Sequence, residues 1–232
     1  MEIFFRQLIL KLILINHQLP VMRLYNQSLT FIKLILVILI ISATPFSAQG
    51  NTIYKSTDAG KTWQNIGLNK TKHIAAVRIH PQNPDIVLVA AQGAVHGPTE
   101  DRGIYKTIDG GKTWKKVLYI NENTGACDLS MDMTNPRILY AGFWEHQRMA
   151  WQVKSGGPGS ALYKSIDGGE TWTKLTEGLP KVMGKVAISV SRANPNRVYA
   201  NIEAEGDKGG VYRSDDAGKS WNQTSKARIT VA

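Results

Sequence analysis

Cysteine is nearly absent from this sequence: one residue, Cys127, occurs in 232 positions, so no intrachain disulfide can form. Cys127 falls in an alternating apolar run with Leu129 and Met131, which predicts a small, buried side chain. Histidine is also scarce, with five residues, and neither residue type shows the spacing of a metal site. The sequence therefore predicts no metal and no cofactor.

Acidic residues are in deficit, with 18 Asp and Glu against 28 Lys and Arg and a formal net charge of +10. The basic residues are scattered along the chain, and they recur inside a repeat described below. A nucleic-acid interface would instead gather its positive charge on one face. We therefore expect a solvated basic surface and no nucleic-acid partner.

No apolar run reaches the comfortable length of a membrane span. The clearest, residues 34–41, is preceded by basic residues and followed by Ser47-Ala48. This order is typical of a secretory signal, and an ordinary signal would begin at Met22. We expect residues 1–48 to be a signal segment, with an uncleaved membrane anchor as the alternative. The expected location is periplasmic, cell-surface or secreted, with membrane contact only through this segment.

One eight-residue pattern, [Ser/Thr]-x-Asp-x-Gly-x-[Ser/Thr]-Trp, occurs four times. Its copies occupy residues 56–63, 107–114, 165–172 and 214–221. Their tryptophans follow one another at intervals of roughly fifty residues, a period typical of propellers and other stacked repeats. The pattern therefore predicts a repeat architecture.

The residue types of the pattern predict a structural turn. Glycine accepts positive φ, and the aspartate carboxylate can accept hydrogen bonds from turn amides. Each tryptophan offers a large apolar face to fill space between neighbouring sheets. The residues with this expected structural role are Asp58, Trp63, Asp109, Trp114, Asp167, Trp172, Asp216 and Trp221.

A second recurring element is Asn-Pro, a turn signal that lies between two apolar runs in each period. The three copies are at 83–84, 135–136 and 194–195. Adding the two strands that flank each Asp-Gly turn gives four strands per period, which is the content of a propeller blade. The sequence thus predicts an all-β fold: a partial β-propeller of four-stranded antiparallel blades, three complete plus a half, over residues 49–232.

Three and a half blades are fewer than the four to eight that close a ring. An open stack would leave sheet faces and strand edges exposed. We therefore expect a fragment of a larger propeller, completed by further blades or by a second chain.

These motifs resemble the Asp-box repeats, also called BNR repeats. Together with His80-Pro81, Gly103-Ile104-Tyr105-Lys106-Thr107, residues 155–160 and Gly178-Leu179-Pro180, they resemble bacterial sortilin-like, glycosyl-hydrolase-type propeller proteins. The resemblance implies an exported scaffold that binds a ligand or a protein. A fragment of a sialidase- or xyloglucanase-like hydrolase is the alternative. Neither catalytic set can be identified in the sequence, so no catalytic residue is assigned and enzyme activity stays open.

A ligand site is expected at the rim with the long loops. The Asn-Pro and Asp-Gly turns should share one rim, which leaves residues 92–102, 144–160 and 203–209 on the opposite rim, where binding residues usually lie. A protein, peptide or carbohydrate could be bound there, although the same loops could simply pack on one another and on further blades. The candidate residues are Arg102, Trp144, Glu145, Arg148 and Trp151.

Overall fold

The computed structural model describes residues 52–226, which lie within one compact unit, Gln49–Ala232. The expected signal or anchor segment, residues 1–48, lies outside the described residues. Apart from one 3-10 turn, η1 (Gly206–Lys208), the regular structure of the described residues consists of β-strands. Within this part of the chain no helix is long and apolar enough to cross a bilayer.

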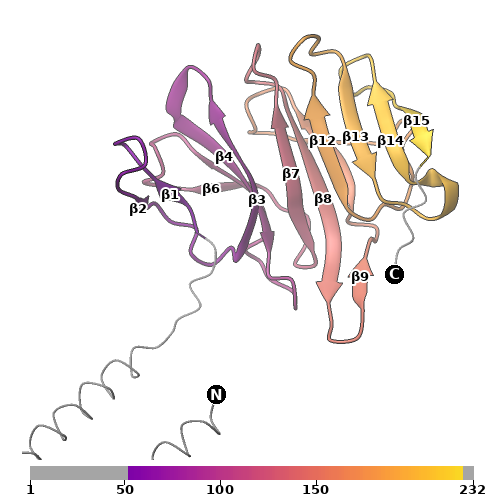
Figure 1. The fold of residues 1–232 in the computed structure, drawn as a ribbon, viewed down its shortest axis with the longest axis horizontal. Coiled ribbons are helices and arrows are strands. Elements are labelled where there is room, and N and C mark those ends of the chain that lie inside the picture. The colour runs from indigo at the N-terminus through magenta and orange to yellow at the C-terminus, as the bar shows by residue number, and fades with distance from the viewer. Residues whose placement is uncertain (1–51, 227–232) are drawn as a thin grey trace, which may run out of the picture. The chain divides into compact units, whose positions relative to one another are not determined.

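The strands form a half-blade and three blades that follow one another in chain order (Figure 1). The half-blade pairs β1 (Tyr54–Lys55) with β2 (Gln64–Asn65). The first blade has the order β3 (His73–His80), β4 (Asn83–Gly93), β5 (Gly103–Thr107) and β6 (Lys115–Leu118). Every strand pair in both sheets is antiparallel.

The second and third blades repeat this meander. The second has the order β7 (Thr124–Met131), β8 (Leu139–Arg148), β10 (Ala161–Ser165) and β11 (Thr173–Leu175), with β9 (Val153–Ser155) paired to β8. The third has the order β12 (Val186–Val190), β13 (Val198–Ile202), β14 (Gly210–Ser214) and β15 (Asn222–Lys226). The predicted all-β partial propeller of three blades and a half is confirmed.

Two boundaries differ from the sequence-based expectation. The segment 144–160 was expected to be a long loop, but β8 continues to Arg148 and a hairpin returns through β9. The first Asn-Pro pair, Asn83-Pro84, lies at the start of β4 rather than in the turn before it. In both cases backbone pairing with a neighbouring strand outweighs the local turn composition.

The four eight-residue repeats fold into the same hydrogen-bonded turn, called the repeat turn below. In the second copy, the Thr107 hydroxyl donates to Asp109 Oδ1 over 2.7 Å and accepts the Gly111 amide over 3.0 Å. The Thr113 amide and hydroxyl donate to the two oxygens of Asp109 over 2.9 and 2.6 Å. The other three copies make the same four contacts. The aspartate thus closes each turn, as its residue type predicted.

Three of the four repeat tryptophans pack toward the preceding blade, as expected. Trp221 is buried in the core between the second and third blades, and Trp172 packs on the core between the first and second. The Trp114 indole donates to the Ile66 carbonyl of the half-blade over 2.7 Å. Trp63 is the exception, with 63% of its surface exposed, because no preceding sheet lies beside it among residues 52–226.

The inner strands of the second and third blades, β7 and β12, are joined by side chains of β7. Asp128 accepts the Ile188 amide over 2.8 Å, and Ser130 accepts the Val190 amide over 3.1 Å. The buried Cys127 thiol donates to the Val186 carbonyl over 3.1 Å. Burial raises the thiol pKa to about 12, so Cys127 is a structural thiol, in line with its predicted burial.

Candidate functional site

The two rims of the blades differ in character. Backbone hydrogen bonds join each Asn-Pro segment to the repeat turn of the same blade: Gly110 to Asp85 (3.0 Å), Gly168 to Arg137 (2.8 Å) and Ala217 to Asn196 (2.8 Å). Both turn types therefore lie on one rim, called the turn rim, as predicted. The opposite rim, called the loop rim, carries residues 92–102, 144–160 and 203–209.

Arg102 is fully buried in the loop rim, where its guanidinium binds three backbone carbonyls from two segments. It donates to the carbonyls of Ala94 (2.7 Å), Gly97 (3.1 Å) and Asn123 (2.8 Å). Gly93, at φ +79°, leaves room for this side chain, since a Cβ there would lie 2.4 Å from Arg102 Cγ. Arg102 therefore orders the loops from within and presents no free donor pair at the surface.

His146 continues this buried cluster. Arg102 Nη1 donates to its Nδ1 over 3.3 Å, and its Nε2 lies 3.3 Å from the Gln92 amide nitrogen. Burial, followed by smaller effects that include the nearby Arg102 charge, lowers the His146 pKa to about 4. The imidazole is therefore neutral at neutral pH. Its ring stacks on Trp144, with centroids 4.2 Å apart.

Trp144 lies at the junction of the second and third blades. Its indole donates to the Ser155 hydroxyl over 3.0 Å, and Lys185 Nζ lies 5.4 Å from its ring, within cation–π range. The Ser155 hydroxyl in turn donates to Glu203 over 2.7 Å, and the same carboxylate accepts the Lys185 amide over 2.7 Å. This network fixes the orientation of a half-buried indole.

Glu145 is buried and holds the loop that follows β9. Its carboxylate accepts the Gly159 amide over 3.0 Å and Lys154 Nζ over 3.1 Å. A Cβ at Gly157 would overlap the same carboxylate, so the loop is fitted around it. These contacts give Glu145 a positioning role in the loop rim.

Arg148 and Trp151 lie in the hairpin between β8 and β9 and differ from the other candidates in exposure. Trp151 is 79% exposed. The Arg148 amide donates to the Val95 carbonyl over 2.7 Å, which ties the hairpin to the neighbouring loop, while the rest of the residue is exposed. The structure thus separates the predicted candidates into a buried supporting group, the partly exposed Trp144 and an exposed pair in the hairpin between β8 and β9.

Two residues of this surface, Lys185 and Gln92, were not among the sequence-based candidates. Lys185 is an isolated lysine before β12, and only the packing of adjacent blades brings it to Trp144. Gln92 lies in β4, and its contact with His146 again crosses between blades. Neither carries a local sequence signal. No group of three His, Cys, Asp or Glu side chains within residues 52–226 could hold a metal ion.

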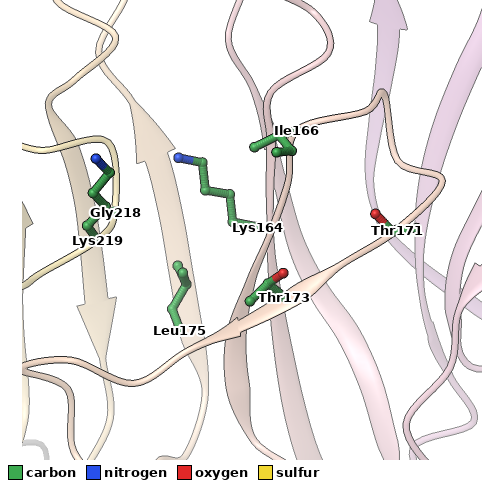
Figure 2. Close-up of a pocket in the computed structure, with 7 residues that line it drawn as sticks. All are labelled: Lys164, Ile166, Thr171, Thr173, Leu175, Gly218 and Lys219. Atoms are coloured by element: carbon green, nitrogen blue, oxygen red, sulfur yellow. The ribbon is translucent and has the colours of Figure 1, made fainter.

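The turn rim contains grooves between adjacent blades. One, between the second and third blades, has a volume of about 230 Å³. Figure 2 shows two lysines there, Lys164 on β10 and Lys219 on the repeat turn of the third blade, beside Thr171, Thr173 and Leu175. An equivalent groove between the first and second blades contains Lys106, Lys115 and Glu170.

Similarity to known proteins supports the fold and defines the family. A curated protein from Neosartorya fischeri, a probable oligoxyloglucan-reducing end-specific xyloglucanase, is 29% identical over 196 residues, which cover 72% of this chain and 20% of that protein. The crystal structure of an ancestral GH74 enzyme matches with a TM-score of 0.59 at 21% identity, over 77% of this chain and 22% of that one. The GH74 enzyme of Niastella koreensis matches with a TM-score of 0.55 at 22% identity, over 75% and 26%.

The chain spans about a fifth to a quarter of the length of the curated relatives it matches. The family model described as "Sortilin, neurotensin receptor 3" matches residues 40–156, half of the sequence. The four-stranded antiparallel blades agree with the β-propeller architecture of the solved neighbours. The chain therefore belongs to the Sortilin-Vps10 family.

Proposed function

We propose that this chain is the ligand-binding segment of an exported β-propeller, and that its loop rim binds a carbohydrate chain. The observation that carries the proposal is the aromatic face of Trp151, 79% exposed, on the same rim as the partly exposed Trp144. Flat aromatic side chains with a polar edge are well suited to stacking on sugar rings. The exposed Arg148, in the same hairpin as Trp151, and Lys185, 5.4 Å from the Trp144 ring, add hydrogen-bond donors to this rim.

The supporting residues make this surface pre-organised. Trp144 is fixed by Ser155, by the stacked His146 and by Lys185. The hairpin that carries Trp151 is tied to the neighbouring loop through the Arg148 amide. Side chains held before binding lose less conformational freedom when a ligand arrives, which favours affinity.

The names of the curated relatives suggest the class of carbohydrate. Two proteins that match this chain are named as xyloglucanases, so xyloglucan oligosaccharides are the first ligands to test. A fragment of a glycoside hydrolase is the second candidate, supported by the same relatives. A hydrolase needs two opposed carboxyl groups, and the buried Glu145 and the partly buried Glu203 already accept structural hydrogen bonds. This favours binding over hydrolysis by the chain alone.

Export and completion by further blades belong to the same proposal. The basic, apolar and small residues within 1–48 have the order of a secretory signal. Trp63 at the half-blade and Tyr199 on the outer face of the third blade are exposed aromatic residues at the two ends of the stack. Further blades, in the same polypeptide or in a second chain, would cover them.

The test is calorimetric titration of the chain with xyloglucan oligosaccharides, in the wild type and in Trp151→Ala. Loss of the aromatic face should weaken binding about tenfold, the equivalent of ~1.4 kcal/mol. Trp63→Ala is the matched control, because Trp63 is a similarly exposed tryptophan that lies in a repeat turn on the opposite, turn rim. Equal affinities in all three proteins would refute the site. Reducing ends released in the same samples would support the hydrolase instead.

A further inference from the structure

A basic residue precedes the aspartate of every repeat turn by three positions. These residues are Lys55, Lys106, Lys164 and Arg213. The first three reach across to the repeat turn of the following blade: Lys55 to the Gly110 carbonyl (3.4 Å), Lys106 to Glu170 (2.6 Å) and Lys164 to the Ala217 carbonyl (2.6 Å). Each groove on the turn rim therefore contains one ammonium group at an equivalent place.

In two of these grooves the following blade also supplies a carboxylate. Asp85, next to the Asn-Pro pair of the first blade, lies 3.8 Å from Lys55. Glu170, in the repeat turn of the second blade, accepts Lys106 over 2.6 Å and Lys115 over 3.0 Å. In the groove on either side of the first blade, the chain itself thus places a carboxylate beside the ammonium group at the equivalent place.

The groove between the second and third blades lacks both carboxylates. Asn196 occupies the position that corresponds to Asp85, and Lys219 occupies the position that corresponds to Glu170. Among the described residues Lys164 forms no salt bridge. Burial lowers the pKa of Lys164, and the charge of Lys219 adds to this effect. Asp216 is the nearby carboxylate, but its oxygens accept hydrogen bonds from Ser214 and Ser220.

We propose that this groove binds an acidic peptide, whose Glu or Asp carboxylate is held between Lys164 and Lys219. In the neighbouring groove the Glu170 carboxylate accepts Lys106, the counterpart of Lys164, and also Lys115, whose counterpart here is Thr173, so lysines of this rim can hold a carboxylate. The lining of the groove also includes Leu175 and Ile166, which is 66% exposed, so an apolar residue beside the acidic one would have a contact surface (Figure 2). This site lies on the rim opposite the proposed carbohydrate site and is independent of it.

The experiment is a fluorescence titration of the full chain with the labelled peptide acetyl-Ala-Leu-Glu-Leu-Ala-amide and with its Gln analogue. The Glu peptide should bind at least tenfold more tightly, and added salt should weaken its binding because the contact is electrostatic. Equal affinity for the two peptides would overturn the proposal. A uronic-acid oligosaccharide that binds as tightly as the Glu peptide would overturn its peptide part.

Two variants place a carboxylate in this groove at the positions where the other two grooves of the turn rim have one. Lys219→Glu copies the arrangement around Glu170, and Asn196→Asp copies the arrangement around Asp85. Each should weaken the Glu peptide at least tenfold without lowering the unfolding temperature. Unchanged binding in both, with the fold intact, would contradict the proposal.

Glu170→Gln tests the same idea in the opposite direction. It removes the internal carboxylate from Lys106 and Lys115, so a second peptide should bind in the groove between the first and second blades. The stoichiometry should rise from one to two. A Glu170→Gln stoichiometry that stays at one would mean that free lysines on this rim do not suffice for binding.

Discussion

The repeat-turn aspartates combine exposure with a strong local preference for the charged form. Each of these carboxylates accepts hydrogen bonds from the hydroxyls on both sides of it in the sequence and from a backbone amide. The hydrogen bond from the hydroxyl of the following Ser or Thr lowers the carboxyl pKa most. For Asp58 the pKa falls to about 2, and it is also lowered in the other three. The stabilised carboxylate explains why a turn can hold a residue with unfavourable backbone geometry. Ala59 and Ala217 adopt φ of 58°, where the other two copies have glycine.

The pKa shifts predict an acid sensitivity of folding. Each aspartate has a lower pKa in the folded chain than in the unfolded chain, so its contribution is complete above pH ~4 and is lost as the pH falls through the folded pKa. We expect the urea midpoint of the wild type to fall between pH 4 and pH 2. In Asp216→Asn, which has no charge to lose at this turn, the fall should be smaller. Urea unfolding followed by tryptophan fluorescence measures both.

The control for this prediction is Asp207→Asn, which removes a charge from an exposed carboxylate outside the repeat turns. Its ion pair with Lys226 is long, at 3.8 Å. It should retain the wild-type dependence on pH. An Asp216→Asn protein with the same pH dependence as the wild type would mean that other carboxylates control acid unfolding.

At the scale of elements, β12 would be an open strand edge without the side chains of β7. Its outward amides at Ile188 and Val190 point away from β13 and are accepted by Asp128 and Ser130. Unpaired edge amides are costly when buried and promote pairing with other chains when exposed. These two polar side chains of β7 therefore set the register of two adjacent blades as well as satisfying the edge amides.

Removing one of these acceptors should cost measurable stability. In Asp128→Ala the Ile188 amide, in a residue only 4% exposed, loses its partner, and we expect a loss of about 1–3 kcal/mol in the free energy of unfolding. Hydrogen exchange at the Ile188 amide should accelerate relative to Val198 in the same sheet. Ser189→Ala is the control, since Ser189 is exposed on the other face of β12. A stable Asp128→Ala protein with slow exchange at Ile188 would show that water replaces the carboxylate.

The strands could be predicted from the sequence because their signals are local. The repeated Asp-x-Gly segments and the second and third Asn-Pro pairs mark turns, and the alternation in segments such as Val186–Val190 marks buried faces. The hairpin through β9 was missed because its strand is three residues long and carries no clear alternation. The burial of Arg102 and Glu145 depends on backbone carbonyls and amides of other loops, which no local sequence pattern reveals. The residue types of the loop rim could therefore be predicted, but not which of them face outward.

At the scale of the whole molecule, each blade contacts the following blade through the same set of strand positions. A cross-strand row on each blade faces the following blade: Arg78–Leu88–Lys106 on the first and Ser130–Tyr140–Lys164 on the second. From the second row, Ser130 accepts the Val190 amide, while Tyr140 and Lys164 donate to the Ala217 carbonyl. The third blade repeats the row as Ser189–Tyr199–Arg213. Its Tyr199 is 39% exposed because no described residue covers this face.

This direction predicts how the isolated chain associates. The second blade binds the repeat turn of the third blade, and the exposed repeat turn with Trp63 is the counterpart of that turn in the half-blade. We therefore expect the half-blade of one copy to pack on the Tyr199 face of the third blade of another copy. We expect self-association that rises with concentration in sedimentation experiments on the wild type. Such a head-to-tail contact is heterologous, and it leads to closed rings or to open filaments depending on the rotation between copies.

Trp63→Ser and Tyr199→Ala should each reduce the association, because each removes an aromatic contact from one of the two complementary faces. Val182→Ser, which alters an equally exposed apolar residue in the segment before β12, should not. A wild type that stays monomeric at every concentration would mean that these faces require a blade of different sequence.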